Sequence, residues 1–396
     1  MKVEEGIVEA TNDVKNRKKP KISLIIITLI IGLGIGFWGG KQVDSANKLD
    51  YSGLDEVYSV LRENFDGEID TDLLLEGAKK GMVAGLGDPY TQYFTRVDAQ
   101  EFNEDLEGEF SGVGIELNNK DGYIVIVDVL DGTPAEQAEL LAGDIIIKVD
   151  ETDVSDWASE EAVKIIRGDT GSIVKLTIIR DGSVKEFEIK RSRINNPSVR
   201  AKIVDGYGIL SISRFGETDT TRLSRIAAQE FVDKDVKGVI LDLRSNGGGY
   251  VSAAVDVASL WMEKGEIVTT EKVGQLVSNS EKAKGNNILK DFKTVVLING
   301  ASASASEIVA GALQDNNLAT IIGTQSFGKG SVQTIQPLRS GDKLKITIAH
   351  WFTPNGNNLD DEGIKPDENI EFDVEAYRAD ETDNQLQKAI EFLKSL

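Results

Sequence analysis

The feature that most constrains the fold is a repeat of apolar strand, small-residue loop and helical pattern in the second half of the chain. Three apolar runs of strand length occupy 238–244, 293–299 and 318–324. Loops of small residues, 245–249 and 300–304, follow the first two runs. This order predicts an α/β core with a mostly parallel sheet, and in such sheets the working groups collect where the strands end. We therefore expect the two loops to meet at one edge of the sheet.

Composition excludes several classes of function. The chain of 396 residues has room for about two or three domains, and its 40% apolar content predicts a largely globular protein. A net charge of −22 argues against a nucleic-acid partner, because phosphate binding requires basic surfaces. The absence of cysteine excludes disulfides and thiolate zinc sites, and we expect neither a metal nor another cofactor.

An uncharged apolar segment at 22–38 predicts a membrane anchor. Basic residues at 15–21 precede it, so the positive-inside rule places the N-terminus in the cytoplasm and residues 41–396 on the other side. A cleaved signal peptide is the alternative, but Gly40 and Ala46 lack the small residue two positions earlier that a cleavage site requires. The pattern favours a retained single-pass anchor in the cell membrane.

Two features near the anchor bear on assembly. Gly32, Gly36 and Gly40 repeat every four residues, a spacing that lets membrane helices approach closely in a homodimer. The alternative is that glycine is simply common in such segments. Helical patterns at 54–65 and 71–85 carry no reacting group, and we interpret them as packing or oligomerisation elements.

Residues 107–192 form a separate β-rich module in the pattern. Strand-like runs and two helical runs predict its elements: strands at 112–117, 123–130, 144–149, 173–179 and 185–190, and helices at 134–141 and 158–167. With the segment PAEQAELLAGDIIIKVD at 134–150, this order resembles a PDZ domain. The loop Gly112-Val113-Gly114-Ile115 offers successive N–H groups suited to a carboxylate. The resemblance implies capture of a free C-terminus, with an apolar terminal side chain preferred.

The alternating serines at 302–306 raise the question of which one reacts. Ser304 stands three residues before Glu307, which predicts a capping box and a helix beginning there. An ordinary N-cap is one interpretation. The other is a nucleophile at the end of a strand, with the N–H of Ala305 stabilising an oxyanion.

Activation of a serine requires a base, and the chain has a single histidine. His350 lies in the strand-like run 343–352, where we expect it to be packed. Lys329, between Gly328 and Gly330, is the alternative, since a buried lysine can lose its proton near neutral pH. The run 323–329 also approaches a phosphate-binding P-loop. Gly330 stands where that loop needs Ser or Thr, and a strand rather than a helix follows.

Several motifs together resemble the C-terminal processing proteases, also called tail-specific proteases. They are GMVAGLGDPYTQYF (81–94), LDLRSNGGG (241–249), NGASASASEIVAGALQD (299–315), GTQSFGKGSVQ (323–333) and WFTPNG (351–356). The resemblance covers nearly all of 50–396. It implies peptide-bond hydrolysis by a Ser–Lys dyad separated by 25 residues, and 329 − 304 = 25 selects Ser304 and Lys329.

The resemblance also implies the supporting residues. Gln333 orients the lysine, and the backbone N–H groups of Ala305 and Gly248 form the oxyanion hole. Arg167 links the PDZ module to the protease core, the alternative being a solvated cation at a helix end. Asp315 matches an aspartate that some members need, which we interpret as structural. Asp360-Asp361-Glu362 replaces the basic or histidine residue found in many relatives before Gly363-Ile364.

The sequence thus predicts a multi-domain α/β protein. Its predicted parts are a cytoplasmic tail (1–21), a transmembrane anchor (22–40), an N-terminal helical region (41–106), a PDZ domain (107–192), a protease core (193–380) and a C-terminal helix (381–396). The predicted function is a serine endopeptidase acting on extracytoplasmic proteins or peptides. The alternatives are a membrane-anchored PDZ scaffold and an inactive pseudoprotease.

Overall fold

The computed structural model describes residues 49–120, 122–360, 362–380 and 382–396 of the chain. It divides into two compact units, one ending at Leu74 and one spanning Leu75–Leu396. The predicted anchor at 22–40 lies outside the described residues. Within the ranges that are described, no helix is both long and apolar enough to cross a bilayer.

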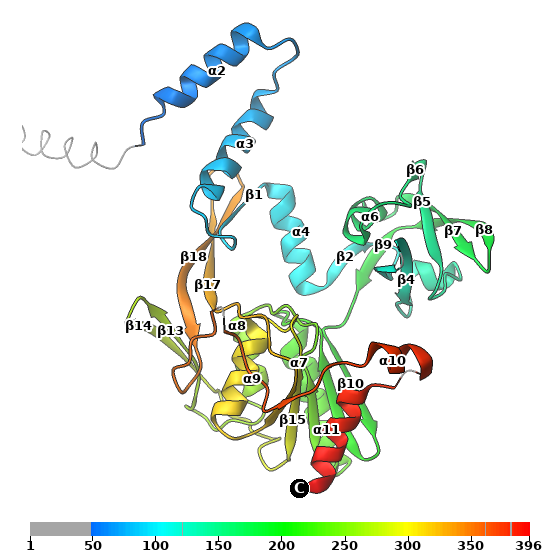
Figure 1. The fold of residues 1–396 in the computed structure, drawn as a ribbon, viewed down its shortest axis with the longest axis vertical. Helices are drawn as coiled ribbons and strands as arrows, with labels where there is room; N and C mark the ends of the chain where they lie inside the picture. Colours follow the sequence, from blue (N-terminus) through cyan, green and yellow to red (C-terminus); the bar gives the residue numbers. More distant parts are fainter. Residues whose placement is uncertain (1–48, 121, 361, 381) are drawn as a thin grey trace, which may run out of the picture. The chain divides into compact units, whose positions relative to one another are not determined.

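Among the described residues, three helices precede the β-rich module: α2 (Ser52–Asn64), α3 (Thr71–Ala84) and α4 (Arg96–Glu107) (Figure 1). The predicted apolar stripe of α2 is exposed, since Leu54 and Val57 keep more than half of their accessible surface, 53% and 57%. At the start of α4, Thr95 and Asp98 form a capping box, and Gly108 ends the helix in a left-handed conformation with φ 68°. The sequence therefore fixes both ends of α4.

The β-rich module is built on a twisted antiparallel sheet and two short helices. Its strands are β2 (Glu109–Gly112), β3 (Ile115–Lys120), β4 (Tyr123–Val129), β5 (Ile145–Val149), β6 (Thr152–Asp153), β7 (Ile173–Arg180), β8 (Ser183–Lys190) and β9 (Ser192–Asn195), and its helices are α5 (Pro134–Gln137) and α6 (Ser159–Ile166). The main sheet has the order β3-β4-β5-β7-β8, which leaves β3 at an edge. β2 pairs with β9, so the chain enters and leaves the module side by side.

Two predictions for this module need correction. The strand expected at 112–117 is interrupted, because β2 ends at Gly112 and Gly114 takes a positive φ of 89° before β3 begins. The helix expected at 134–141 stops after Gln137, because Glu139 adopts a left-handed backbone with φ 60°. Both differences come from single residues with positive φ, which the apolar pattern does not report.

The core has the predicted mostly parallel sheet. Its strands are β10 (Val199–Val204), β11 (Tyr207–Ile212), β12 (Val239–Asp242), β15 (Thr294–Ile298), β16 (Thr320–Gly323) and β19 (Glu368–Asn369), in the order β10-β11-β12-β15-β16-β19. In this sheet β11, β12, β15, β16 and β19 run parallel to one another, whereas β10 pairs antiparallel with β11. The strand order confirms the predicted α/β core.

Helices cover both faces of this sheet. α7 (Asp219–Asp233), α8 (Val251–Ala258) and α9 (Ala305–Asp315) contribute to one apolar core, and α11 (Asn384–Ser395) to another, while α10 (Val374–Asp380) precedes α11 (Figure 1). Along β12, Val239 and Leu241 enter the first core and Ile240 enters the second. This alternation follows from the two-residue period of a strand, and it buries both faces.

A second sheet lies beyond the parallel one and is antiparallel. It contains β1 (Gln92–Phe94), β13 (Ile267–Val273), β14 (Leu276–Lys282), β17 (Ser331–Pro337) and β18 (Lys343–Phe352). β18 is its centre, because β1, β13 and β17 all pair with it. The loop that carries Lys329 connects β16 of the first sheet to β17 of the second, and so it lies where the two sheets meet.

Candidate active site

The three alternating serines have different environments. Ser302 is fully buried, and its hydroxyl donates to the carbonyl of Leu243 at 2.8 Å. Ser306 is also fully buried, and its hydroxyl donates to the carbonyl of Asn246 at 2.9 Å. Ser304 is only partly buried, and its side chain makes no capping hydrogen bond. Its hydroxyl is therefore the one of the three that is not committed to the backbone.

The backbone of Ser304 is strained. Its φ of 55° and ψ of −113° lie outside the regions that residues with a side chain normally adopt. Such a conformation costs about 1–3 kcal/mol and persists only where the surroundings impose it, most often at functional sites. α9 begins at the next residue, Ala305, as predicted.

We expect Ser302→Ala and Ser306→Ala to keep peptide turnover within about threefold of the unmodified protein. Each substitution removes one buried hydrogen bond, which lowers the free energy of unfolding by about 0.5–1.5 kcal/mol, since the carbonyls of Leu243 and Asn246 keep the backbone N–H groups of Asn246 and Ala303. Thermal unfolding should therefore shift while steady-state kinetics stay similar. Loss of turnover in a folded Ser302→Ala or Ser306→Ala protein would show that the wrong serine has been chosen.

The glycine loop 245–249 lies directly against Ser304. A Cβ added to Gly248, whose φ is 106°, would lie 2.8 Å from the Cβ of Ser304 and 3.1 Å from the nitrogen of Ala305. The two predicted oxyanion donors are thus neighbours, and only glycine allows this approach. In this structure the N–H of Gly248 donates to Oδ1 of Asn246 at 2.9 Å. Gly248 can serve as predicted only after that bond is released.

A buried carboxylate joins the serine loop to the lysine loop. Glu307 is fully buried in the first turn of α9. Its Oε2 accepts the backbone N–H groups of Ser304 at 2.7 Å and of Lys329 at 3.0 Å. Its Oε1 accepts the hydroxyl of Ser326 at 2.6 Å and the N–H of Gly328 at 2.7 Å. One side chain therefore holds the backbone of both predicted dyad residues.

Lys329 occupies a partly buried position between two glycines. A Cβ at Gly330 would lie 2.2 Å from the nitrogen of Asp360, so the chain passes too closely for any side chain there. The Lys329 ammonium lies 5.0 Å from the centre of the Tyr90 ring. Burial lowers the pKa of Lys329 below that of an ordinary lysine, and the nearby charge of Glu307 partly opposes this shift. The net direction is the one a lysine base requires.

Gln333, expected to orient Lys329, has other partners in this structure. Gln333 donates to the hydroxyl of Ser331 at 2.8 Å and, more weakly, to that of Thr347 at 3.5 Å. Among the described residues it makes no hydrogen bond to Lys329, and Ser304 and Lys329 make none with each other. The pairing of β17 with β18 has a register shift between Val332 and Gln333.

His350 is not the packed sheet residue expected. Its side chain keeps 45% of its accessible surface, and its Nδ1 lies 2.9 Å from Oδ2 of Asp360. The other oxygen of Asp360 accepts the N–H of Gly330 at 3.2 Å. The acidic segment that departs from the family pattern therefore touches the loop of Lys329, which the sequence did not indicate.

Asp315 has a structural contact at the end of α9. Its Oδ2 accepts the N–H of Asn355 at 2.8 Å, in the turn that follows β18. This contact fixes the WFTPNG segment against α9. It agrees with the interpretation of Asp315 as structural.

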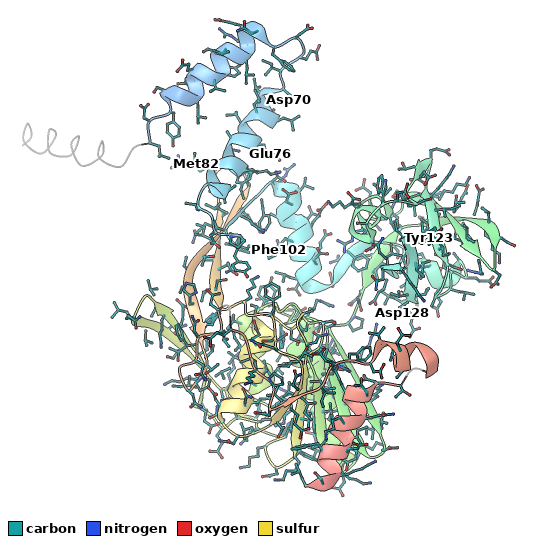
Figure 2. The ribbon with its side chains drawn as sticks, viewed as in Figure 1. Asp70, Glu76, Met82, Phe102, Tyr123 and Asp128 are labelled. Atoms are coloured by element: carbon teal, nitrogen blue, oxygen red, sulfur yellow. The ribbon has the colours of Figure 1, made fainter. Side chains whose placement is uncertain are left out.

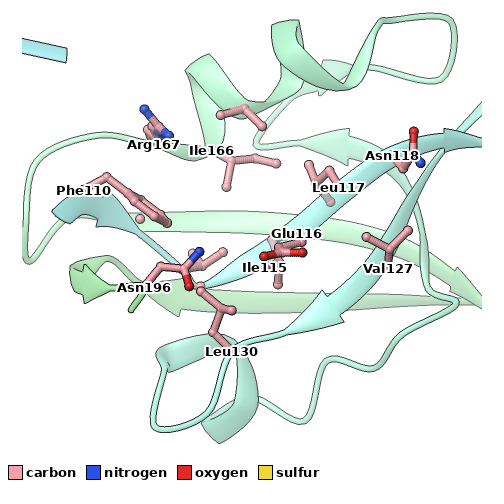
Figure 3. Close-up of a pocket in the computed structure, with 14 residues that line it drawn as sticks. Phe110, Ile115, Glu116, Leu117, Asn118, Val127, Leu130, Ile166, Arg167 and Asn196 are labelled. Atoms are coloured by element: carbon pink, nitrogen blue, oxygen red, sulfur yellow. The ribbon is translucent and has the colours of Figure 1, made fainter. Parts of the chain in front are cut away.

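The β-rich module carries a groove of about 370 Å³ between β3 and α6. Figure 3 shows Ile115 and Leu117 of β3 on one side and Ile166 of α6 on the other. Asn119 of β3 joins the strand to the start of α6, because its side chain accepts the N–H of Ser159 at 2.7 Å and donates to the carbonyl of Trp157 at 3.0 Å. The groove is apolar and borders a free strand edge.

The predicted carboxylate loop lines one end of this groove. The carbonyl of Val113 accepts the N–H of Ala135 at 2.9 Å, and the carbonyl of Gly114 accepts that of Leu130 at 3.0 Å. In a trans peptide the N–H points opposite to the carbonyl, so the N–H groups of Gly114 and Ile115 point away from the module interior. Gly112, Val113, Gly114 and Ile115 all line the groove. A peptide carboxylate would meet donors there.

Arg167 stands at the same end of the groove (Figure 3). Its Nη1 lies 2.8 Å from Oδ1 of Asp105 on α4, and its guanidinium lies 4.7 Å from the centre of the Phe110 ring. Its Nε is buried and has no hydrogen-bond partner in the described structure. Arg167 is therefore joined to a helix outside the module.

Sequence reasoning missed three contributors to the site. Glu307 was read only as a helix cap, and Tyr90 only as part of a motif. Asn246 was not considered, although it is fully buried and its carbonyl also accepts the N–H of Ala303 at 2.9 Å. The available signals were a glutamate in an apolar helix and an asparagine before three glycines.

Comparison with protein families covers most of the chain. Residues 206–370 match peptidase family S41. Residues 111–190 match the PDZ domain, and residues 38–97 match the N-terminal domain of the activating protease CtpB. The three matches follow one another along the chain, with the PDZ domain between the other two.

Individual relatives match this chain over most of its length. A protein of Staphylococcus aureus (strain COL) named "Probable CtpA-like serine protease" is 35% identical over 364 residues, which are 90% of this chain and 72% of the relative. One of the same name from Staphylococcus haemolyticus (strain JCSC1435) is 36% identical over 353 residues, 88% of this chain and 71% of the relative.

Two solved protease structures superpose on most of this chain. The photosystem II D1 C-terminal processing protease superposes with a TM-score of 0.53 at 27% identity, covering 82% of this chain and 87% of that one. A structure from Bacteroides fragilis NCTC 9343, described as an S41 protease, has a TM-score of 0.57 at 17% identity, covering 85% and 96%, and supports the fold alone.

Proposed function

Because the chain belongs to peptidase family S41, as a CtpA-like serine protease with a PDZ domain, we propose that Ser304 and Lys329 are its catalytic dyad. Neutral Lys329 takes the proton of the Ser304 hydroxyl as the oxygen attacks the peptide carbonyl. The N–H groups of Ala305 and Gly248 stabilise the oxyanion. Lys329 then gives its proton to the leaving amine, and water hydrolyses the acyl-enzyme. Gln333 orients Lys329 once substrate is bound.

The observation that carries this proposal is the position of Glu307. Its carboxylate binds the backbone N–H of Ser304 and that of Lys329 at the same oxygen. Two residues far apart in the sequence are thereby held to one buried group, at the junction of the two sheets. The uncommitted hydroxyl of Ser304 and the lowered pKa of Lys329 supply the remaining requirements of a Ser–Lys dyad.

This assignment sets aside the two alternative functions. A PDZ scaffold would have no use for the S41 half of the chain. A pseudoprotease lacks at least one reacting residue, whereas both Ser304 and Lys329 are present with a strained serine backbone. Ser304 should therefore react with a fluorophosphonate probe, and the unmodified protein should hydrolyse unfolded polypeptides.

We further propose that the groove of the PDZ domain selects substrates by a free, apolar C-terminus. A substrate tail adds to the free edge of β3, with its carboxylate at Gly114 and Ile115. Amidating the C-terminus of an otherwise identical peptide should lower kcat/KM by about tenfold or more. Replacing its last apolar residue by aspartate should have a similar effect. Equal cleavage of acid and amide forms would remove the groove from substrate selection.

Arg167 is the proposed link between this groove and the protease core. Its partner Asp105 lies on α4, which also packs against β1 of the second sheet. We expect Arg167→Ala to lower turnover of long substrates several-fold and to change the free energy of unfolding by less than about 1 kcal/mol, because the ion pair is partly exposed. A small internal peptide cleaved by both proteins is the control. Unchanged kinetics for both substrates would leave Arg167 as a surface residue.

We propose that residues 22–40 anchor the protein in the cell membrane, with the protease outside the cytoplasm. The support is the apolar run and the basic residues before it. Added protease should degrade residues 41–396 in intact spheroplasts. Protection until lysis would reverse the orientation.

A further inference from the structure

A largely buried arginine outside the roles assigned above lies where the chain passes into and out of the PDZ domain. The chain enters that domain at 107–108, directly after α4, which Figure 2 marks with Phe102, and leaves it at 195–196, after β9. These two crossings lie side by side, because β2 and β9 pair with each other. Arg214, in the segment between β11 and α7, reaches both crossings, and its side chain keeps only 14% of its accessible surface.

The guanidinium of Arg214 binds the backbone of both crossings. Its Nη2 donates to the carbonyl of Glu107 at 2.9 Å and to the carbonyl of Asn196 at 2.6 Å. A Cβ added to Gly108 would collide with Cζ of Arg214, so the guanidinium packs on the backbone where only glycine leaves room. The crossings therefore hold Arg214 through main-chain contacts.

Arg214 is poorly paired for a cation in this position. Among the carboxylates that the structure describes, only Asp219 forms an ion pair with it, at 3.4 Å, and Asp219 also accepts the N–H of Ser198 at 2.9 Å. The Nε of Arg214 is buried and has no hydrogen-bond partner within the described ranges. Taking a charge out of water is costly, and only excellent pairing offsets the cost. These contacts therefore favour a role in placing the chain over a role in stability.

The backbone at Arg214 holds the proposed oxyanion loop. In the peptide unit between Arg214 and Phe215, the N–H donates to the carbonyl of Gly248 at 2.9 Å, and the carbonyl accepts the hydroxyl of Thr220 at 3.2 Å. The carbonyl of Phe215 accepts the N–H of Tyr250 at 2.8 Å. Phe215 therefore binds the glycine loop both before and after its last glycine.

The bond from Phe215 gains importance when the oxyanion donor is released. The N–H of Gly248 is bonded to Asn246 in this structure and must leave it to meet a substrate oxygen. The bond from the Phe215 N–H to the Gly248 carbonyl does not involve that donor, so it remains. It keeps the loop beside Ser304 while the N–H turns toward the oxyanion.

We propose that Arg214 is a positioning residue for the reaction, which fixes Phe215 to the two crossings and thereby places the Gly248 N–H for the oxyanion. This inference rests on the proposed oxyanion hole. Without the guanidinium, the peptide unit between Arg214 and Phe215 loses its anchor, and Gly248 is displaced from Ser304. The defect is expected in kcat and in the binding of transition-state analogues, because the oxyanion forms only after Ser304 attacks.

The first test compares Arg214→Met with the unmodified protein in steady-state cleavage of one short peptide. Removing one donor from an oxyanion hole lowers kcat by about 100- to 1000-fold, and a displaced donor retains part of its effect. We therefore expect kcat to fall by about tenfold or more, whereas KM stays within about twofold. Arg225→Met is the matched control, because Arg225 is exposed on α7 and the same charge is removed. Should Arg214→Met fail to fold, Arg214→Gln replaces it.

A second readout separates the oxyanion hole from general damage. A peptide aldehyde that ends in an apolar residue binds covalently: the Ser304 oxygen bonds to the aldehyde carbon, the Ser304 proton passes to Lys329, and the former carbonyl oxygen enters the oxyanion hole. The alcohol of the same peptide forms no such adduct. In Arg214→Met protein the dissociation constant of the aldehyde should rise about tenfold, whereas that of the alcohol should change by less than about twofold.

The outcomes distinguish the two levels of the proposal. An unchanged preference for the aldehyde in Arg214→Met protein, or equal weakening of both peptides, would overturn the role of Arg214 while leaving the dyad intact. Equal binding of the two peptides by the unmodified protein would instead contradict the proposed dyad and oxyanion hole, and the role of Arg214 with them.

Discussion

Glu307→Gln is expected to lower kcat by about 100-fold or more while the protein remains folded. The carboxylate accepts two donors at each oxygen. An amide places its NH₂ against one of these pairs, whichever way it is oriented. At least one backbone N–H beside Ser304 or Lys329 is then buried without an acceptor, at a cost of about 1–3 kcal/mol. A displacement of about 1 Å at a catalytic group can cost 100-fold in rate.

The measurement is kcat and KM for a short peptide, with thermal unfolding of the same samples. Glu230→Gln is the matched control, since Glu230 is exposed on α7, far along the chain from both catalytic loops. Its kinetics and unfolding temperature should match those of the unmodified protein. Turnover by a folded Glu307→Gln protein within threefold of normal would show that the four hydrogen bonds to the Glu307 carboxylate are not needed for catalysis.

The overall organisation of the protein could be predicted because it depends on local patterns. The period of the apolar residues indicated the parallel strands β12, β15 and β16 of the core. The loop Gly112–Ile115 indicated one end of the groove in the PDZ domain. In each case a few neighbouring residues carry the signal. The antiparallel sheet around β18 was largely missed, because its strands come from three separate parts of the chain.

The sequence indicates the proposed reacting groups of the site but not the residues that support them. Ser304 and Lys329 could be selected by spacing and by the resemblance. Asn246 and Tyr90 lie against the loops of Ser304 and Lys329 through contacts between residues distant in sequence, and no local pattern reports such contacts. The role of Gln333 stays a proposal from the resemblance, since in this structure Gln333 donates to Ser331.

The second large effect is expected at the dyad itself. Ser304→Ala should lower kcat by about 10⁴-fold or more, because no other hydroxyl lies in its place. Its stability should change little, since the Ser304 side chain makes no capping hydrogen bond. Circular dichroism and thermal unfolding of the variant provide the control for folding.

The pH dependence follows from the same account. Lys329 acts only when neutral, so kcat/KM should rise with pH as Lys329 loses its proton. Because burial lowers the pKa of Lys329, this rise should be centred below the range of an ordinary lysine. A rate that falls as pH increases through this range would assign the base to another group.

The central claim is that Lys329 deprotonates Ser304, and turnover by Lys329→Arg tests it most directly. Arginine keeps the positive charge and much of the length, but it does not give up its proton in a protein. The account predicts a folded protein with kcat reduced by about 10³-fold or more at every pH, as for other members of a catalytic unit. A folded Lys329→Arg protein that cleaves the same peptide at a near-normal rate would contradict it.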